Sequence, residues 1–158
     1  MASQSERIVV GFDGSAASGA ALDWAAAEAE RRHLSLTVLL AVEELTPETA
    51  THPARQGLPE TAAHAFAADS IRRARRQAAS IEITVETHVG APIHALIQKS
   101  RHAELVVLGA HGRNQTAGAA AGPVALDVSA RAHCPVMVIH SPEASISLAT
   151  TVATSPPE

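Results

Sequence analysis

A glycine-rich segment is the part of the sequence best suited to binding chemistry. It runs from Gly109 to Gly122 with another glycine at Gly112, which gives the spacing Gly-x2-Gly-x9-Gly. Glycine lets the backbone approach a ligand closely and turn its N–H groups toward it. A helix is expected to follow the segment and would add the positive end of its dipole, so the anionic oxygens of a phosphate are the natural ligand. A small-residue loop that only joins a strand to a helix is the alternative.

Three polar residues accompany this segment. Arg113 would add a cation for a phosphate, whereas His111 is interpreted as a solvated loop histidine rather than a phosphate contact. Asp13 follows an apolar run and could hold a ribose hydroxyl, or could serve only as a turn or capping residue. Neither metal-ligand spacing nor a paired Ser/His/Asp arrangement is present, so no metal site or nucleophilic catalysis is expected. The sequence therefore favours a binding module over an enzyme.

Short apolar runs alternate with alanine-rich segments along the chain. The apolar runs predict strands at residues 8–12, 34–42, 81–88, 105–108 and 135–139. The intervening segments predict helices at residues 16–32 and 61–79, one that opens at Pro92, and one at residues 123–133, with Ser15 as the first N-cap. This alternation predicts a doubly wound α/β fold with a five-stranded parallel sheet. The glycine-rich segment then lies where the fourth strand meets the last helix.

Composition narrows the class of protein. The 158 residues suit one domain, and only Phe12, Trp24 and Phe66 are aromatic, so an aliphatic core is expected. The net charge of −4 argues against nonspecific nucleic-acid binding, which needs a strongly basic surface. No apolar stretch reaches the length of a membrane span, and the N-terminus lacks an apolar signal region. A cytoplasmic protein that binds neither nucleic acid nor membranes is therefore expected.

Four further segments carry weaker expectations. The proline-containing residues 43–60 predict a long loop that could act as a lid. Residues 141–158 are rich in Ser, Thr and Pro and predict a disordered tail. The cluster of Arg72, Arg73, Arg75 and Arg76 is interpreted as a solvated helix surface, and Cys134 as an inert packed thiol.

The spacing of the glycine-rich segment closely resembles the nucleotide-binding loop of the universal stress protein family. Four other segments agree, reading Ile-Val-Val-Gly-Phe-Asp-Gly-Ser from Ile8, Ala-Ala-Leu-Asp-Trp-Ala from Ala20, Val-Gly-Ala-Pro from Val89, and His-Cys-Pro-Val-Met-Val-Ile from His133. The likeness extends from about residue 7 to residue 140. The chain is accordingly divided into a universal stress protein domain at residues 1–140 and a tail at residues 141–158.

The resemblance implies an adenine nucleotide alpha-hydrolase-like sheet with strand order 3-2-1-4-5. Its ligand crevice would open at the carboxyl ends of the first and fourth strands. In members that bind ATP, the position of Asp13 lies beside the adenosine and the backbone at Val42 contacts adenine. Glycines at the positions of Gly109, Gly112 and Gly122 surround the phosphates. The resemblance also implies that two subunits meet through the edge strand from Pro135 to Ile139, which gives a homodimer.

The end of the loop departs from the pattern of ATP-binding members. Pro123 and Ala125 stand where those members usually carry hydroxyl side chains. Because a hydrogen bond to a charged group contributes ~1.5–3 kcal/mol, phosphate binding would weaken roughly tenfold to several-hundredfold. Arg113, the backbone N–H of Val124, or Mg²⁺ could compensate.

The sequence thus predicts a regulatory stress-response module that binds ATP or another adenine nucleotide, with weakened phosphate contacts. Two alternatives stay open. One is a dimeric interaction module that has lost its nucleotide, and the loss of hydroxyl groups at Pro123 and Ala125 favours it. The other is a slow ATPase, for which Asp13 is the candidate residue beside the loop.

Overall fold

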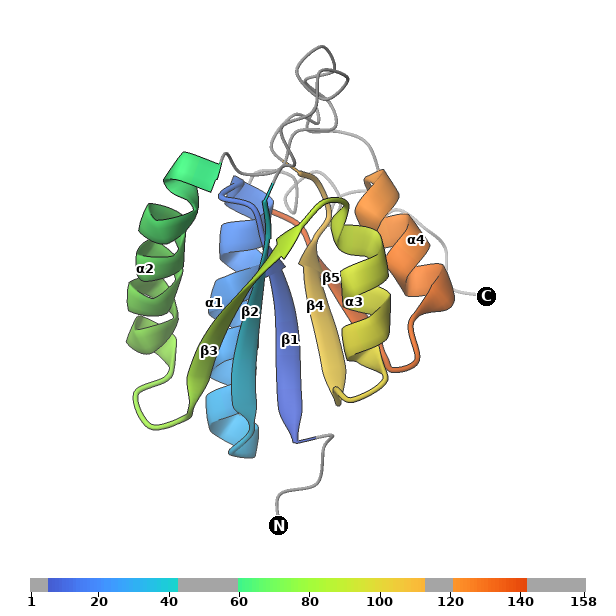
Figure 1. Ribbon diagram of the computed structural model, residues 1–158. Coiled ribbons are helices and arrows are strands. Elements are labelled where there is room, and N and C mark those ends of the chain that lie inside the picture. The colour runs from blue at the N-terminus through green and yellow to red at the C-terminus, as the bar shows by residue number, and fades with distance from the viewer. Residues whose placement is uncertain (1–5, 43–59, 113–120, 142–158) are drawn as a thin grey trace, which may run out of the picture.

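A computed structural model describes residues 6–42, 60–112 and 121–141 of the protein and shows a sheet flanked by helices (Figure 1). The elements in chain order are β1 (Arg7–Phe12), α1 (Ala16–Arg32), β2 (Ser35–Val42), α2 (Glu60–Gln77), β3 (Ile83–Val89), α3 (Pro92–Ser100), β4 (Leu105–Gly109), α4 (Pro123–Arg131) and β5 (Val136–Ile139). The predicted lid and tail, apart from Glu60 and Ser141, lie outside the described residues.

The five strands form one parallel sheet in the order β3-β2-β1-β4-β5. The predicted α/β class and strand order are therefore confirmed. β1 lies at the centre, where Val10 is in register with Val38 of β2 and with Val107 of β4. Since all strands run the same way, their carboxyl ends share one edge, which is the upper edge in Figure 1. The loops after β1 and β4 leave from neighbouring points on that edge.

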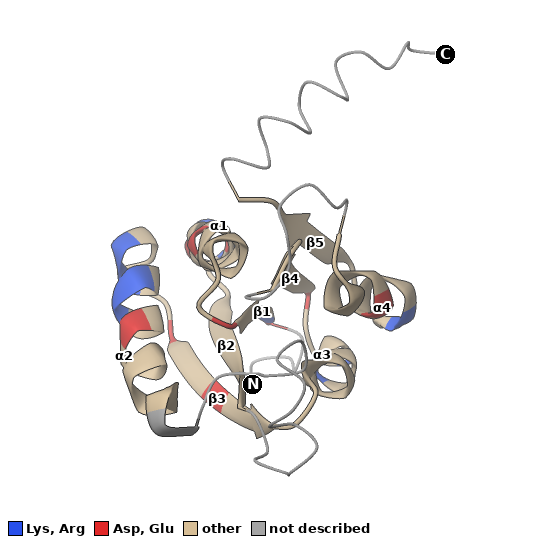
Figure 2. Cartoon of the chain, turned by 90° about the horizontal axis from the view of Figure 1, so that it is seen from above, with Lys and Arg blue, Asp and Glu red and all other residues tan. Residues whose placement is uncertain are grey.

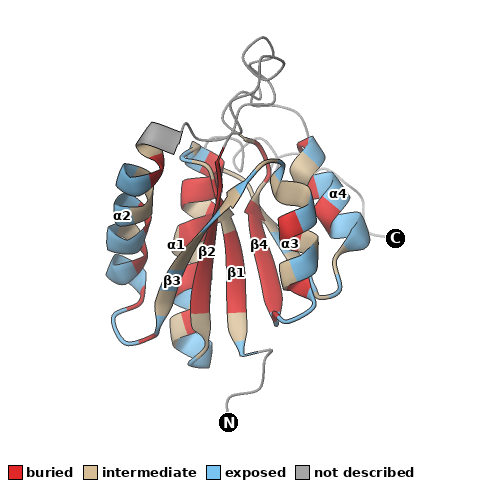
Figure 3. Cartoon of the chain, viewed as in Figure 1, coloured by how far each residue is buried: buried red, intermediate tan, exposed pale blue. Residues whose placement is uncertain are grey.

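Helices cover both faces of the sheet. Viewed from above, α1 and α2 lie on one side of the row of strands, and α3 and α4 lie on the other (Figure 2). Alternate residues of β1 serve the two layers, because Ile8 and Val10 pack with α1 whereas Val9 packs with α3. Figure 3 shows the central strands as the most buried part of the molecule.

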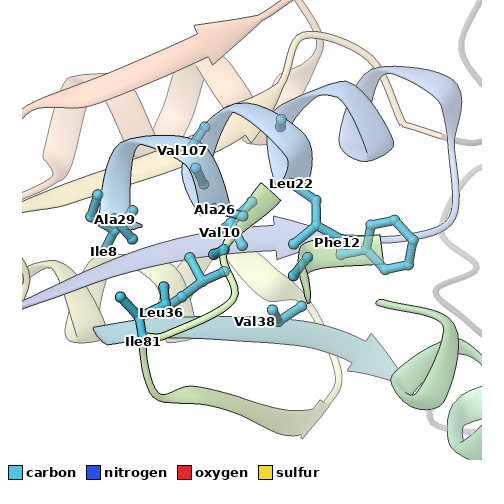
Figure 4. Close-up of a cluster of buried hydrophobic side chains, with 14 of the residues drawn as sticks. Ile8, Val10, Phe12, Leu22, Ala26, Ala29, Leu36, Val38, Ile81 and Val107 are labelled. Carbon is cyan, nitrogen blue, oxygen red and sulfur yellow. The ribbon is translucent and has the colours of Figure 1, made fainter. Parts of the chain in front are cut away.

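The larger core cluster, on the α1 side, is almost entirely aliphatic (Figure 4). Leu22, Ala25 and Ala26 of α1 are fully buried against the sheet, and Phe12 closes the end of the cluster near the carboxyl edge. Small alanine side chains let the helix approach the sheet closely, so the predicted aliphatic core is confirmed. The helix is also well delimited, because Ser15 caps its start and Arg31 and Arg32 occupy its last turn.

Three predicted boundaries differ from the structure by two residues, and the first is the end of α2, which lies at Gln77 rather than at Ala79. β3 begins at Ile83 rather than at Ile81, which lies in the preceding turn. Ile81 is nevertheless only 8% exposed because it packs into the core from the turn, which explains an apolar residue outside the strand. α4 ends at Arg131, two residues before the predicted end.

The sequence suggested that the basic cluster of α2 is a solvated surface, but two of its arginines bind other parts of the protein. Arg73 makes a bidentate ion pair with Asp23 of α1, with both N–O distances 2.8 Å. Arg75 donates to two backbone carbonyls beyond the helix end, those of Ala78 and Ile81. Arg72 and Arg76 are exposed, as expected. Arg73 and Arg75 therefore connect α2 to neighbouring parts of the protein. Figure 2 shows that the basic residues of α2 lie on the side of the helix that faces away from the sheet.

Candidate functional site

The turn after β1 satisfies its own polar groups. Gly14 has a φ of 83°, a left-handed conformation that glycine adopts without strain. The Asp13 carboxylate accepts a hydrogen bond from the N–H of Ser15 at 2.9 Å through Oδ1. The Ser15 hydroxyl accepts from the N–H of Ser18 at 3.1 Å, which confirms Ser15 as the N-cap of α1. The turn residue and capping interpretation of Asp13 is therefore correct for one carboxylate oxygen.

The other carboxylate oxygen of Asp13 faces the loop after β4. A Cβ placed on Gly112 would lie 3.2 Å from Oδ2, so the two predicted site segments meet here. The Ser15 hydroxyl joins the same segments by donating to the carbonyl of His111 at 3.3 Å. The end of β1 and the start of the glycine-rich segment are thus held together by contacts between residues about a hundred positions apart in the chain.

Gly109 is required for a reason that the sequence did not show. A Cβ at this position would lie 2.7 Å from the backbone carbon of Ala17 and from the nitrogen of Ser18. The end of β4 therefore packs directly against the first turn of α1, and a side chain would push the two apart. The sequence predicts that Gly109 allows a ligand to approach the backbone closely. The structure shows that it also allows β4 to pack closely against α1.

The two ends of the glycine-rich segment meet at the start of α4. The N–H of Gly122 donates to the carbonyl of Ala110 at 2.6 Å. Gly122 is the N-cap of α4 but provides no side-chain hydrogen bond, and Pro123 occupies the first turn. The positive end of the α4 dipole therefore lies beside the start of the segment, without a capping side chain to occupy it.

These segments enclose a cavity of about 90 Å³ at the carboxyl ends of β1 and β4. Four predicted site residues line it: Asp13, Gly109, Gly112 and Val124. The remaining wall combines His111 with mainly apolar residues from the neighbouring strands and helices, namely Gly11, Phe12, Ser18, Leu39, Ala41, Pro92, Leu96 and Leu108. The cavity thus joins one carboxylate and two glycines to an apolar floor.

Two of the three remaining predicted site residues do not line the cavity. Val42 ends β2 and is buried, and its carbonyl accepts a hydrogen bond from the N–H of Gly90 at 2.9 Å, while its neighbour Ala41 lines the cavity. Gly122 caps α4 but is not among the lining residues. Arg113 lies outside the described residues. Sequence reasoning missed the apolar floor from β2 and α3, because nothing distinguishes such residues from ordinary core.

His111 is buried, so its interpretation as a solvated loop histidine is wrong. The residue is 9% exposed, and neither ring nitrogen has a hydrogen-bond partner within the described part of the chain. Its ring makes an edge contact with the ring of His140, with centroids 6.3 Å apart. A buried polar group without a hydrogen bond costs about 1–3 kcal/mol. The buried imidazole of His111 therefore lowers the free energy of unfolding of the protein without ligand.

A larger hollow of about 770 Å³ lies on the α3 side of β2 and β3. Its wall is mostly polar and includes Arg7, Glu86, His88, Lys99 and Arg101. None of the predicted site residues lines it, and an ion pair between Lys99 and Glu86 crosses part of this wall. The predicted chemistry therefore belongs to the smaller cavity.

Other features of the described residues concern metal ligands, membrane spans and the one cysteine, Cys134. The described residues contain no group of three His, Cys, Asp or Glu residues that could hold a metal ion, and no helix long and apolar enough to cross a membrane. Cys134 precedes β5, and burial raises the pKa of its thiol. A raised pKa leaves less reactive thiolate at neutral pH, in keeping with the expected inert thiol.

A model of the universal stress protein family matches residues 4–140. The chain belongs to this family. A universal stress protein of Mycobacterium tuberculosis is 34% identical over 149 residues, covering 88% of this chain and 49% of that protein. A second one from the same organism is 32% identical over 133 residues, covering 84% of this chain and 48% of the relative. This universal stress protein chain therefore spans about half the length of the curated relatives it matches.

Solved structures of the family share the fold along their whole length. A universal stress protein in complex with cAMP is 26% identical, with a TM-score of 0.66, and the match covers 88% of this chain and 99% of that one. The universal stress protein UspA from Lactobacillus plantarum is 29% identical, with the same TM-score and the same coverage. The match of this universal stress protein thus extends over nearly all of both solved chains.

Proposed function

We propose that this universal stress protein is a regulatory stress-response module that binds an adenine nucleotide, with ATP as the expected ligand. The observation that carries the proposal is the cavity where Asp13, Gly109 and Gly112 meet at the carboxyl ends of β1 and β4. This is the switch point of the doubly wound sheet, where ligands bind in such folds. A relative that is 26% identical was crystallised in complex with cAMP, which supports an adenine nucleotide.

Each part of the cavity suits one part of a nucleotide. The apolar floor from Leu39, Ala41 and Leu96 suits a base, and Oδ2 of Asp13 can accept a hydrogen bond from a ribose hydroxyl. The backbone around Gly112 and the start of α4 suit a phosphate. At about 90 Å³, the cavity is smaller than the ~300–1,000 Å³ of typical ligand pockets. A bound nucleotide would therefore be only partly enclosed, with each of these wall segments contacting one side of it.

Phosphate binding is expected to be weaker than in members that carry hydroxyl groups after the loop. Pro123 is exposed in the first turn of α4, where it offers neither a hydroxyl nor an N–H. Ala125 is 2% exposed and does not line the cavity, so its missing hydroxyl matters less than the sequence suggested. Arg113, the N–H of Val124 and Mg²⁺ are the proposed sources of compensation.

Binding is favoured over turnover. Among the described residues that line the cavity, Asp13 is the one carboxylate, and its Oδ1 is already engaged by the N–H of Ser15. That leaves a single oxygen for both metal binding and activation of water, which is a poor arrangement for an ATPase. ATP turnover that disappears in Asp13→Ala would support the slow ATPase instead.

The regulatory unit is proposed to be a cytoplasmic homodimer joined through β5. In this chain β5 is an edge strand, and an apolar edge strand needs covering. Met137 on β5 and Leu126 on α4 are 38% and 60% exposed, so this edge carries apolar surface. A monomeric mass in light scattering at micromolar concentration would contradict the dimer.

Calorimetric titration with ATP and Mg²⁺ tests the binding proposal. The natural protein is expected to bind ATP, and Pro123→Ser is expected to tighten binding about tenfold because it restores one hydrogen bond to a charged group. Ala130→Ser, at an exposed position near the end of α4, is the matched control and should leave affinity unchanged. Absence of heat at millimolar ATP would overturn the proposal and leave the nucleotide-free interaction module.

A further inference from the structure

His111 is a buried ionisable side chain whose ring nitrogens form no hydrogen bond with the described residues. It is 9% exposed, lines the cavity, and both its ring nitrogens lack a hydrogen-bond partner within the described residues. Buried polar groups are nearly always hydrogen-bonded, so an exception needs an explanation. A ligand in the cavity would supply the missing hydrogen bond.

The backbone on both sides of His111 is fixed in place. Its carbonyl accepts a hydrogen bond from the Ser15 hydroxyl, and the preceding Ala110 accepts one from the N–H of Gly122 at the start of α4. Its ring is in edge contact with that of His140. His111 is therefore held in the wall of the cavity, near the start of α4, where the helix dipole favours an anionic group.

We propose that His111 recognises the phosphate of the bound nucleotide and makes its affinity depend on pH. This inference rests on the proposed function. A neutral imidazole has one N–H donor, whereas the imidazolium has two donors and a positive charge. Hydrogen bonds between charged partners are roughly twice as strong as those between neutral ones. Phosphate binding should therefore be tighter when the imidazole of His111 is protonated at lower pH.

The charge that a bound phosphate would meet depends on the titratable groups around His111. Two titratable groups among the described residues lie near His111: Asp13, which also lines the cavity, and His140, whose ring is in edge contact with that of His111. The parts of β2, α3 and α4 that line the cavity carry no charge, since they contribute Leu39, Ala41, Pro92, Leu96 and Val124. A phosphate here would meet the negative charge of Asp13, and a protonated His111 offsets it.

Titrations with cAMP and adenosine between pH 8 and pH 5.5 test the proposal. The phosphodiester of cAMP keeps one charge over this range, so a change in its affinity reports on the protein. The natural protein should bind cAMP about tenfold more tightly at pH 5.5 than at pH 8, while adenosine affinity stays constant. His111→Asn should abolish this pH dependence and leave adenosine binding unchanged.

A matched control and a stability measurement complete the test. His133→Asn, at an exposed histidine beyond the far end of α4, should behave as the natural protein. His111→Leu should unfold at a higher denaturant concentration without ligand, because it removes the unsatisfied imidazole, and should lose the pH dependence.

The outcomes separate the two proposals. Persistence of the pH dependence in His111→Asn would overturn the role of His111 and leave nucleotide binding intact. An equal loss of adenosine and cAMP affinity in that variant would also overturn it, since His111 would then serve the base or ribose. Failure of the natural protein to bind either ligand at any pH would overturn nucleotide binding itself, and this inference with it.

Discussion

The two halves of the candidate site differ in how completely they satisfy themselves. In the half formed by β1 and α1, Asp13 and Ser15 have hydrogen-bond partners within the same turn, and α1 has a side-chain cap. In the half formed by β4 and α4, the N-cap of the helix provides no side-chain hydrogen bond. There His111 is buried with both ring nitrogens unsatisfied by the described residues.

This contrast shows which half holds the fold and which is prepared for a ligand. A turn in which Asp13 Oδ1 and the Ser15 hydroxyl are engaged within the protein contributes stability and changes little on binding. A buried group and a helix end without partners cost stability until something binds them. Apart from Asp13, whose Oδ2 is proposed to bind the ribose, substitutions in the first half should therefore affect unfolding more than affinity, and those in the second half should do the reverse.

The largest expected effect on stability is at Gly109, where β4 packs against the first turn of α1 and the two halves of the site meet. Gly109→Ala would place a Cβ 2.7 Å from backbone atoms of Ala17 and Ser18, which cannot move without displacing α1. Overpacking of this kind costs typically 1–3 kcal/mol, and we expect about 2 kcal/mol or more in urea unfolding. Gly112→Ala is the matched variant, because among the described residues its Cβ would meet only the carboxylate of Asp13, at 3.2 Å.

Comparing Gly109→Ala with Gly112→Ala separates the role of the loop glycines in packing from their role in ligand binding. Gly112→Ala should lose under about 1 kcal/mol of stability but bind ATP more weakly, because the new methyl group enters the cavity beside Asp13. If both variants lost stability equally, the contrast between the halves would fail at this seam. Equal losses of affinity with no loss of stability would show that Gly109 serves the ligand after all.

The fold was predictable because its signals are local or carried by several motifs at once. The predicted bounds of α1 match the structure, since a serine cap, an alanine-rich body and two terminal arginines all agree. The strand order came from the family resemblance and is confirmed by the pairing. Ile81 was placed on β3 because an apolar residue in a buried turn gives the same pattern as one in a strand.

The site was only partly predictable, because its properties depend on packing between distant segments. Asp13, Gly109, Gly112 and Val124 were predicted and line the cavity together. The burial of His111 depends on contacts with the ends of β1 and β5, which no local pattern around it encodes.

A smaller effect is expected at the cap of α1. Ser15→Ala would remove the hydrogen bond from the N–H of Ser18 and the one to the carbonyl of His111. Loss of an N-cap costs ≈ 0.5–2 kcal/mol, so we expect about 1 kcal/mol in urea unfolding with little change in ATP affinity. Ser129→Ala, on the exposed surface of α4, is the control and should be neutral. A large loss of affinity without a loss of stability would assign Ser15 to the binding half.

The smallest effect is expected where α1 is tied to α2, farther from the cavity. Arg73→Ala removes the bidentate ion pair with Asp23, in which the two side chains are 41% and 36% exposed. Because solvent screens partly exposed pairs, we expect a loss of about 0.5–1 kcal/mol, and Arg76→Ala at an exposed position should cost less. A double-mutant cycle with Asp23→Ala isolates the pair from other effects of each change. A coupling energy near zero would show that packing of α1 against α2, and not this ion pair, holds the first half of the site in place.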